Sequence, residues 1–215
     1  MITKSSWLSF LVVLALVGSS LGLAPTFAKA ESLTFRISEN GASKATFISD
    51  APLETMKGET GRVSGKVSFD PSNISEVQGT FKIPVASIRT GSDLRDEHLA
   101  GDGWLDAKKH PHATFEISKL VKGPKELKEG KSAKVKVEGK FTVHGVTQTK
   151  VADGTVRWAP SDKEALRIQA SFKLALEDHD VSVPSIVRLK VANEIVVNVD
   201  LRGVAEKSQQ QLAQE

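Results

Sequence analysis

The sequence predicts an all-β domain built from one antiparallel sheet, with one short helical segment inserted between its two halves. Three observations lead to this prediction. Apolar and polar residues alternate with a period of two along most of the chain, as in strands that bury one face. Turn residues separate consecutive runs by short connections, which favours antiparallel neighbours. Only residues 86–117 depart clearly from the alternation, and they therefore predict the inserted segment.

The first half of the chain predicts four strands joined by turns and one longer loop. Alternating apolar positions mark the strands at residues 33–37, 44–50, 63–69 and 77–83. Residues 52–61 contain one proline and two glycines without alternation, so they predict a loop. The sequence Asp-Pro-Ser-Asn at 70–73 predicts a turn, because proline presets φ and Asp or Asn side chains bond to the backbone. The two strands that flank this turn should form a hairpin.

Residues 86–117 predict a cap that contains a short helix. Asp93 is suited to the N-cap position, and Asp96 complements the positive helix end. Helical spacing places three side chains on one face: Leu94, His98 and Leu99. Gly101 and Gly103 end the helix. Trp104 and Leu105 follow as an apolar plug, and Pro111 breaks the chain before a strand at 113–118.

The second half of the chain resumes the alternation, after a Gly/Lys/Glu-rich loop at 122–130. Strands are predicted at 133–143, 148–158, 166–176 and 195–201, and His144-Gly145 turns the chain between the first two. About eight sequentially adjacent strands must bury one apolar face. A sandwich and a barrel both satisfy this requirement. Glycines at inward positions, Gly65, Gly79 and Gly139, favour a barrel by letting strands bend and leaving interior space, although ordinary β-bulges explain them equally well.

Residues 1–30 predict a cleaved signal peptide. They combine a positive start, a short apolar run and an A-x-A site at Ala28-Lys29-Ala30. Removal leaves one barrel-sized domain at 31–205 and a polar tail at 206–215, predicted to be disordered. We therefore expect a periplasmic or secreted protein, typical of a bacterial envelope, with no integral membrane span after cleavage. The absence of cysteine excludes disulfides and a lipoprotein anchor.

The charge pattern argues against a nucleic-acid partner. Removal of residues 1–30 lowers the formal net charge of +3 by two, because that segment holds two lysines and no acidic residue. The remaining basic and acidic residues alternate on strand faces instead of gathering into a stripe. The locally basic stretches, 108–109 and 122–136, are interpreted as solvated surface.

Catalytic and metal-binding motifs are not recognised in the sequence. His110 and His112 could share one side of a strand with His98 or Asp106 nearby, but Pro111 separates them and no second motif completes a metal site. No serine lies in a G-x-S-x-G elbow, and cysteine is absent. We therefore expect no catalytic residues, no metal and no cofactor, and a protein that is not an enzyme.

Several of these residues resemble the signature of the YceI-like family. The matching positions are Arg89, Arg95-Asp96-x-His98-Leu99, Trp104-Leu105-Asp106, Pro111, Thr114-Phe115 and the run from Gly139 to the His-Gly-Val-Thr turn at 144–147. The order and spacing hold over nearly all of the mature chain. This resemblance implies a lipocalin-like antiparallel barrel that holds a polyisoprenoid or an isoprenoid-quinone type lipid. It also decides the choice between sandwich and barrel in favour of a barrel of about eight strands.

The expected ligand contacts fall in the cap and in the barrel interior. We expect the ligand to meet these residues: Arg89, Arg95, Asp96, His98, Leu99, Trp104, Leu105, Phe115, Phe141 and Phe172. The charged members, together with Asp106, could recognise a lipid head group or could pin the cap as a salt-bridge network.

The sequence is also compatible with two other functions. The first is a periplasmic hydrolase or isomerase that uses the Arg/Asp/His group near the cap. The second is a structural or stress-protective protein whose core is filled. The sequence also leaves a homodimer open.

Overall fold

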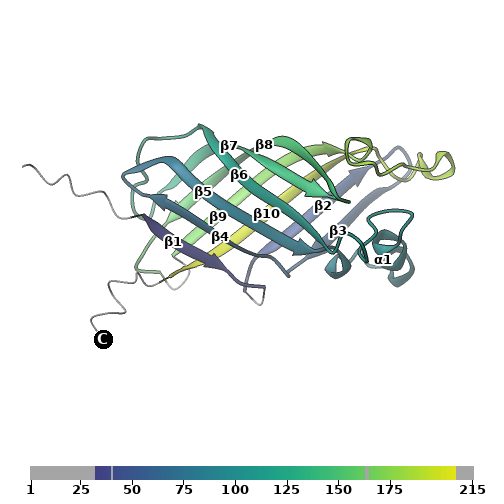
Figure 1. The fold of residues 1–215 in the computed structure, drawn as a ribbon, viewed down its shortest axis with the longest axis horizontal. Coiled ribbons are helices and arrows are strands. Elements are labelled where there is room, and N and C mark those ends of the chain that lie inside the picture. Colours follow the sequence, from purple (N-terminus) through teal and green to yellow (C-terminus); the bar gives the residue numbers. More distant parts are fainter. Residues whose placement is uncertain (1–31, 40, 163–164, 207–215) are drawn as a thin grey trace, which may run out of the picture.

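The computed structural model describes residues 32–39, 41–162 and 165–206, and shows an elongated antiparallel β-barrel (Figure 1). The elements in chain order are β1 (Leu33–Ile37), β2 (Lys44–Asp50), β3 (Thr55–Thr60), β4 (Ser64–Asp70), β5 (Asn73–Pro84), η1 (Val85–Ser87), α1 (Asp93–Ala100), β6 (His112–Lys122), β7 (Ser132–Val143), β8 (Val146–Trp158), β9 (Leu166–Ala175), η2 (Glu177–His179), η3 (Ser185–Val187) and β10 (Glu194–Ala205). The predicted signal peptide and residues 207–215 of the predicted tail lie outside the described residues.

Eight strands close into a ring, which confirms the predicted barrel. Their order is β1-β4-β5-β6-β7-β8-β9-β10, and β1 pairs again with β10. Consecutive strands from β4 to β10 are neighbours, as the short connections predicted. The predicted adjacency is wrong for the first two strands, because β1 pairs with β4 and β10, and β2 pairs with β10 and β3. The predicted hairpin of β4 and β5 is also present, and its turn is held by Asp70, which accepts from the Ser72 N–H at 2.8 Å.

β1 and β2 lie one after the other along the same edge of β10. β2 pairs with β10 residues 195–200, and β1 pairs with residues 204–205. Ser43 sits at the break between them and is buried. Its hydroxyl accepts from the Arg202 N–H at 2.9 Å. A side chain thus replaces the strand backbone at the break, which keeps the wall continuous there.

Residues 52–61 were predicted to be a loop, and that prediction is wrong for most of the segment. They contain β3, whose six residues pair in register with β2. The local sequence, Thr-Met-Lys-Gly-Glu-Thr, has little strand character of its own. The strand forms because β2 offers a complete hydrogen-bonding edge and the Phe47 ring covers Gly58. The other edge of β3 meets the cap, where Glu59 and Arg89 exchange two backbone hydrogen bonds of 2.8 and 2.9 Å.

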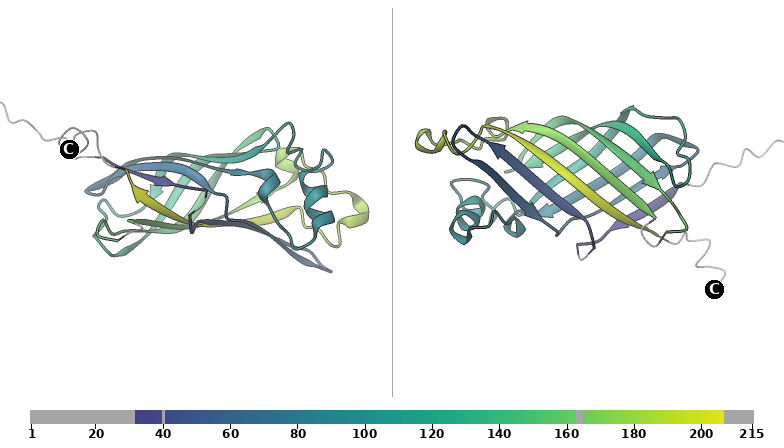
Figure 2. Two further views of the ribbon diagram at one scale, coloured as in Figure 1. Left: turned by 90° about the horizontal axis from the view of Figure 1, so that it is seen from below. Right: turned by 180° about the vertical axis from the view of Figure 1, so that it is seen from behind.

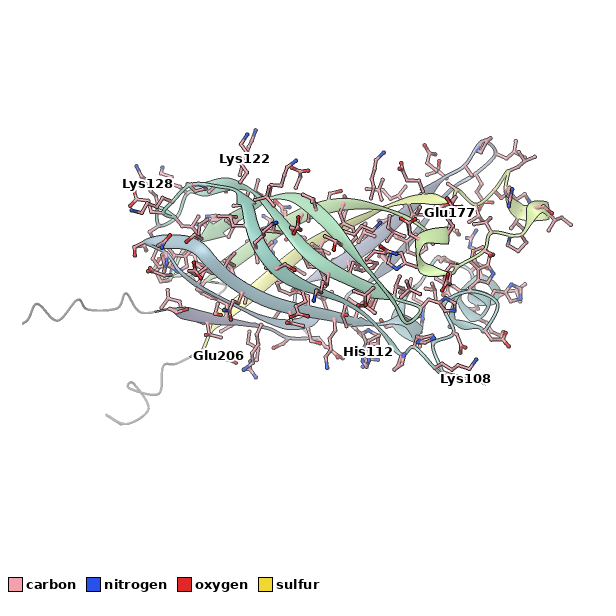
Figure 3. The ribbon with its side chains drawn as sticks, turned by 45° about the horizontal axis from the view of Figure 1, so that its top comes forward. Lys108, His112, Lys122, Lys128, Glu177 and Glu206 are labelled. Carbon is pink, nitrogen blue, oxygen red and sulfur yellow. The ribbon has the colours of Figure 1, made fainter. Side chains whose placement is uncertain are left out.

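The two ends of the barrel are covered differently. α1, η2 and η3 gather at one end, which we call the cap end (Figures 1 and 2). The opposite end, which we call the closed end, is covered by the loop between β6 and β7. Leu127 of that loop is 6% exposed, and its N–H donates to the Pro71 carbonyl at 2.7 Å. Figure 3 shows Lys122 and Lys128 at the closed end, and Lys108 and His112 projecting at the cap end.

Inward glycines make room for aromatic rings in the wall. A Cβ at Gly139 would lie 2.5 Å from the Phe115 ring, and one at Gly65 would lie 2.9 Å from Phe81. The inward direction of these glycines was predicted correctly. The predicted interior space beside these two is filled, however, because the rings lie directly over the glycine backbone.

The C-terminal end of the barrel is tied to its start. Glu206 is the first residue of the predicted tail. Its N–H donates to the Thr34 carbonyl at 2.8 Å, and its carboxylate lies 3.1 Å from the Lys66 ammonium group. Among the described residues, no helix has the length and apolar character needed to cross a membrane.

Candidate functional site

The barrel encloses a cavity with two lobes. The inner lobe, about 150 Å³, lies toward the closed end. The outer lobe, about 120 Å³, lies beneath the cap. Four residues line both lobes and so mark where they meet: Ala45, Ile83, Phe141 and Val197. We call these four the waist. The two lobes together run along the long axis of the barrel.

The inner lobe has an apolar wall. Phe115 and Phe172 line it, and Leu127 bounds it at the closed end. Lys82 and Thr114 are the polar residues in the described part of its wall, and Lys82 is exposed on the outer surface. A wall of this kind has no polar group that must be matched by a ligand, so it suits a hydrocarbon.

The outer lobe contains polar residues whose hydrogen bonds are made within the wall. The Ser49 hydroxyl accepts from the Ala192 N–H at 2.9 Å. The Thr60 hydroxyl lies 2.8 Å from that of Ser87 and accepts from the Arg62 N–H at 3.0 Å. Because these groups are already bonded, the outer lobe also presents a largely apolar surface to whatever enters it.

Three predicted aromatic contacts come together at the waist and in the inner lobe. The ring centroids of Phe115 and Phe172 are 5.6 Å apart, and those of Phe141 and Phe172 are 5.0 Å apart in an edge-to-face arrangement. The residues come from three separate strands, β6, β7 and β9. Sequence alternation placed each on the inward face, and barrel closure brought them into contact.

The cap forms the outer wall of the outer lobe through Leu99, Trp104 and Leu105. The Leu105 N–H donates to the Leu99 carbonyl at 3.1 Å, and the Asp106 N–H donates to Gly101 at 2.8 Å. These bonds fold the chain back on the end of α1. As a result, the three predicted apolar cap residues face the cavity together.

The helix differs from the prediction in its start and its faces. Ser92, not Asp93, is the N-cap, and the helix ends at Gly101 as predicted. Leu94 is 63% exposed and His98 is exposed, so the predicted common face with Leu99 is wrong. The inward face is formed instead by residues 95, 96, 99 and 100. Arg95 binds Glu54, Asp96 binds Thr90 and Leu99 lines the outer lobe, and these contacts leave positions 94 and 98 facing solvent.

Asp96 is the centre of the polar network in the cap. Its carboxylate accepts from the Thr90 N–H at 2.7 Å and from the Thr90 hydroxyl at 2.6 Å, and it lies 3.9 Å from Arg89. The Thr90 hydroxyl, then its N–H and the two nearby guanidinium groups, lower the pKa of Asp96 below its usual range. Asp96 therefore stays ionised and holds the start of α1 against residues 89–90.

The two arginines of the network bind protein groups. Arg95 contacts Glu54 of the β2–β3 turn at 2.8 Å, and Arg89 donates to the carbonyls of Ala86 and Ile88, both at 2.9 Å. The Arg95 contact ties the cap to the β2–β3 hairpin, whereas the Arg89 contacts hold the cap segment together. Their geometry fits the interpretation that the network pins the cap.

Two residues of the predicted polar group lie apart from this network. His98 is exposed on the outer side of α1. Asp106 is buried at positive φ and binds Lys109 at 2.9 Å, and this lysine lowers the pKa of its carboxyl. Sequence proximity suggested one group, but the turn at 101–106 carries Asp106 away from Asp96.

Several residues that shape the cavity were not predicted from the sequence. Leu127 is the main such residue at the closed end. Apart from Pro124, it is the one apolar residue between Gly123 and Gly130, and this pattern could have indicated that it is buried. Met56 and Val191, which line the outer lobe, lie in segments without clear alternation. The pairing of β3 with β2 places Met56, and the turn after η3 places Val191; local pattern reveals neither.

His179 is a buried residue that the sequence did not single out. It is 0% exposed, its Nδ1 lies 3.0 Å from the Val146 carbonyl, and its ring meets Phe141 edge to face at 5.5 Å. Its Nε2 has no hydrogen-bond partner among the described residues. Residues 179, 181 and 183 are all buried, and this alternation with a period of two could have predicted that His179 faces inward.

Burial lowers the pKa of His179, and Lys150 adds to this, whereas the Val146 carbonyl, Asp178 and Asp180 oppose it. The folded protein thus disfavours the protonated ring. Above pH 6.5, the ordinary pKa of histidine, the ring is neutral in both the folded and the unfolded protein. As the pH falls below 6.5, the unfolded chain takes up the proton more readily than the folded protein, so the free energy of unfolding decreases. We expect wild type to lose stability below this pH more steeply than His179→Asn, by up to about 1.4 kcal/mol per pH unit.

Urea unfolding between about pH 5 and 8 measures this difference, since asparagine keeps a donor for Val146 but does not titrate. His112→Asn, at an exposed histidine, is the control and should keep the wild-type slope. Parallel pH profiles for wild type and His179→Asn would show that His179 carries no such linkage.

Known proteins share this fold and sequence. The model of the YceI-like domain matches residues 35–203. A UPF0312 protein of Vibrio parahaemolyticus is 30% identical over 156 residues, which cover 71% of this chain and 72% of the relative. The crystal structure of Burkholderia cenocepacia BcnA is similar with a TM-score of 0.61 at 23% identity, covering 77% of this chain and 96% of that one.

A second solved structure gives a similar match. It is a polyisoprenoid binding domain from Saccharophagus degradans, implicated in plant cell wall breakdown, with a TM-score of 0.60 at 17% identity, covering 80% of this chain and 98% of that one. Both structures support the fold, and the family model spans most of the sequence. The chain therefore belongs to the family of YceI-like domains.

Proposed function

We propose that this protein is a binding protein that holds a polyisoprenoid or a similar long apolar lipid along the barrel axis. The observation that carries the proposal is the two-lobed cavity, whose walls are predominantly apolar from the cap to Leu127 and whose buried hydroxyls, Ser49 and Thr60, are hydrogen-bonded within the wall. An elongated hydrocarbon can occupy both lobes without leaving a polar group unpaired. The similarity to the Saccharophagus degradans polyisoprenoid binding domain supports the same class of ligand.

The dimensions of the cavity add one requirement. Each lobe is comparable in size to an engineered cavity of about 150 Å³ that accepts one benzene ring. A chain of several isoprene units must therefore pass the waist. Phe141, which lines both lobes, is the side chain whose rotation would widen that passage.

The hydrolase or isomerase alternative would need the charged cap residues at the ligand. In the structure, Asp96 binds Thr90, Arg95 binds Glu54, and Arg89 binds backbone carbonyls. This arrangement favours a binding role for the protein, with the charged group holding the cap in place.

We include export in the proposal, because residues 1–30 carry the features of a signal peptide. The binding protein would then act in the periplasm or outside the cell. N-terminal sequencing of the protein purified from its own host should begin at Glu31-Ser32. Folded protein that still begins at Met1 would contradict export by cleavage.

Organic extraction of the full-length protein, followed by mass spectrometry, tests the binding function. We expect wild type to release a prenyl-type lipid in near-stoichiometric amount. Ala45→Phe places a ring in the waist and should lower lipid content about tenfold or more. Lys44→Phe, at the neighbouring exposed position, is the matched control and should retain the lipid.

Two results would overturn the binding proposal. One is a folded wild type that releases no long apolar molecule and takes up no added prenol. The other is an Ala45→Phe protein that carries as much lipid as Lys44→Phe, since the ligand would then lie outside the two lobes.

A further inference from the structure

The outermost point of the cap end carries exposed apolar side chains. η3 and the residues after it project beyond the barrel at the far end of its long axis (Figures 1 and 2). Ile186 is 91% exposed and Leu189 is 57% exposed. Leu53 of the β2–β3 turn is 67% exposed, and its N–H donates to the Leu189 carbonyl at 2.8 Å. We call Leu53, Ile186 and Leu189 the tip.

The tip is an ordered turn with two faces. Lys190 and Val191 both donate N–H bonds to the Val187 carbonyl, at 2.8 and 2.9 Å. Val187 and Val191 pack inward, and Val191 lines the outer lobe. Ile186 and Leu189 point the other way. One turn of chain thus separates the exposed apolar surface from the cavity wall.

The η3 side of the tip is positively charged. Residues 181–193 contain Arg188 and Lys190, both exposed, and no acidic residue. Of the two carboxylates near Leu53, Glu54 is paired with Arg95 at 2.8 Å, and Asp50 accepts a hydrogen bond from the Thr55 hydroxyl. The exposed side of α1 carries Asp93 and Glu97, which a negative surface would repel. This asymmetry favours an approach in which the tip leads and α1 stays away from the surface.

We propose that the tip is a docking surface for an anionic lipid bilayer. Aliphatic side chains flanked by Arg and Lys match the headgroup boundary of such a bilayer, where apolar groups insert and basic groups meet lipid phosphates. Docking in this way would bring the outer lobe against the bilayer, so that a lipid chain could pass between membrane and barrel. The exchange step rests on the proposed function, whereas the docking itself does not.

Co-sedimentation of the full protein with vesicles tests the proposal. We expect wild type to bind phosphatidylcholine vesicles that contain roughly a quarter phosphatidylglycerol, and to bind pure phosphatidylcholine weakly. The double variant Ile186→Ser/Leu189→Ser should bind at least about tenfold more weakly, because both inserting side chains are lost. Arg188→Gln/Lys190→Gln should lose about tenfold at low salt, and wild-type binding should fall as salt rises.

The control variant makes the same kind of substitution, exposed aliphatic residue to serine, at the other end of the barrel. Val121→Ser/Val204→Ser removes two exposed aliphatic side chains away from the cap end, 48% and 53% exposed, and should leave vesicle binding unchanged. Extraction of each variant should return the wild-type amount of lipid, since the tip does not line the cavity.

The outcomes separate docking from lipid binding. If wild type carries lipid but binds neither kind of vesicle, the docking proposal is overturned and the proposed function is unaffected. The tip would then contact a protein partner instead of a bilayer. Equal vesicle binding by wild type and the Ile186→Ser/Leu189→Ser variant overturns it as well. Wild type that docks but holds no lipid contradicts the proposed function and supports docking.

Discussion

Replacing Gly139 by valine is expected to lower the free energy of unfolding by about 3 kcal/mol. A Cβ at this position would lie 2.5 Å from the Glu116 carbonyl oxygen and 2.5 Å from the Phe115 ring. The ring can move, but the carbonyl belongs to the paired strand β6 and cannot shift without loss of the ladder. Displacing Phe115 would also push the ring into the inner lobe and lower the lipid content.

Lys140→Val is the matched control, one residue along β7 and on the outer face. Lys140 is exposed, and valine suits a strand, so the free energy of unfolding should change by no more than about 0.5 kcal/mol. Denaturant unfolding and lipid extraction of both variants measure the difference. Equal midpoints and equal lipid content would mean that the two faces of β7 are assigned the wrong way round.

Asp96→Ala is expected to speed ligand release by roughly tenfold while moving the unfolding midpoint little. The carboxylate is the group that joins Thr90 and the start of α1, so its loss frees the cap. α1 has no buried residue, and the strand ladder does not depend on it. A cap governs exit from the cavity, whereas the sheet governs global stability. Trp104→Ala, which removes part of the outer wall, should also speed release.

Stopped-flow release of a fluorescent prenol, alongside unfolding curves, tests the cap. Asp93→Ala is the control, because Asp93 is an exposed carboxylate on the same helix and should leave the release rate unchanged. Trp104 emission should shift when lipid is stripped, and Trp158, which packs toward the closed end, should respond less. If Asp96→Ala and Trp104→Ala unfold early but release ligand at the wild-type rate, the segment is scaffold and not a lid.

Local pattern in the sequence was sufficient for most of the strands. Alternation predicted β7, β9 and the inward direction of Phe115, Phe141 and Phe172, because side chains in a strand point to opposite faces with a fixed period of two. The turns at 70–73 and 144–145 were also predictable, since their residue types suit the backbone angles that turns require. His144 and Gly145 indeed have φ values of 53° and 77°.

Tertiary structure alone decided how the strands enclose a cavity. β3 exists because β2 presents an edge to it, and Leu127 closes one end because its loop folds back onto Pro71. The space beside Gly139 is filled because Phe115 reaches it from the next strand. The outward turn of Leu94 and His98 follows from how α1 lies on the barrel end. Each of these features depends on contacts between residues far apart in sequence, whereas a period of two records only which face a residue takes.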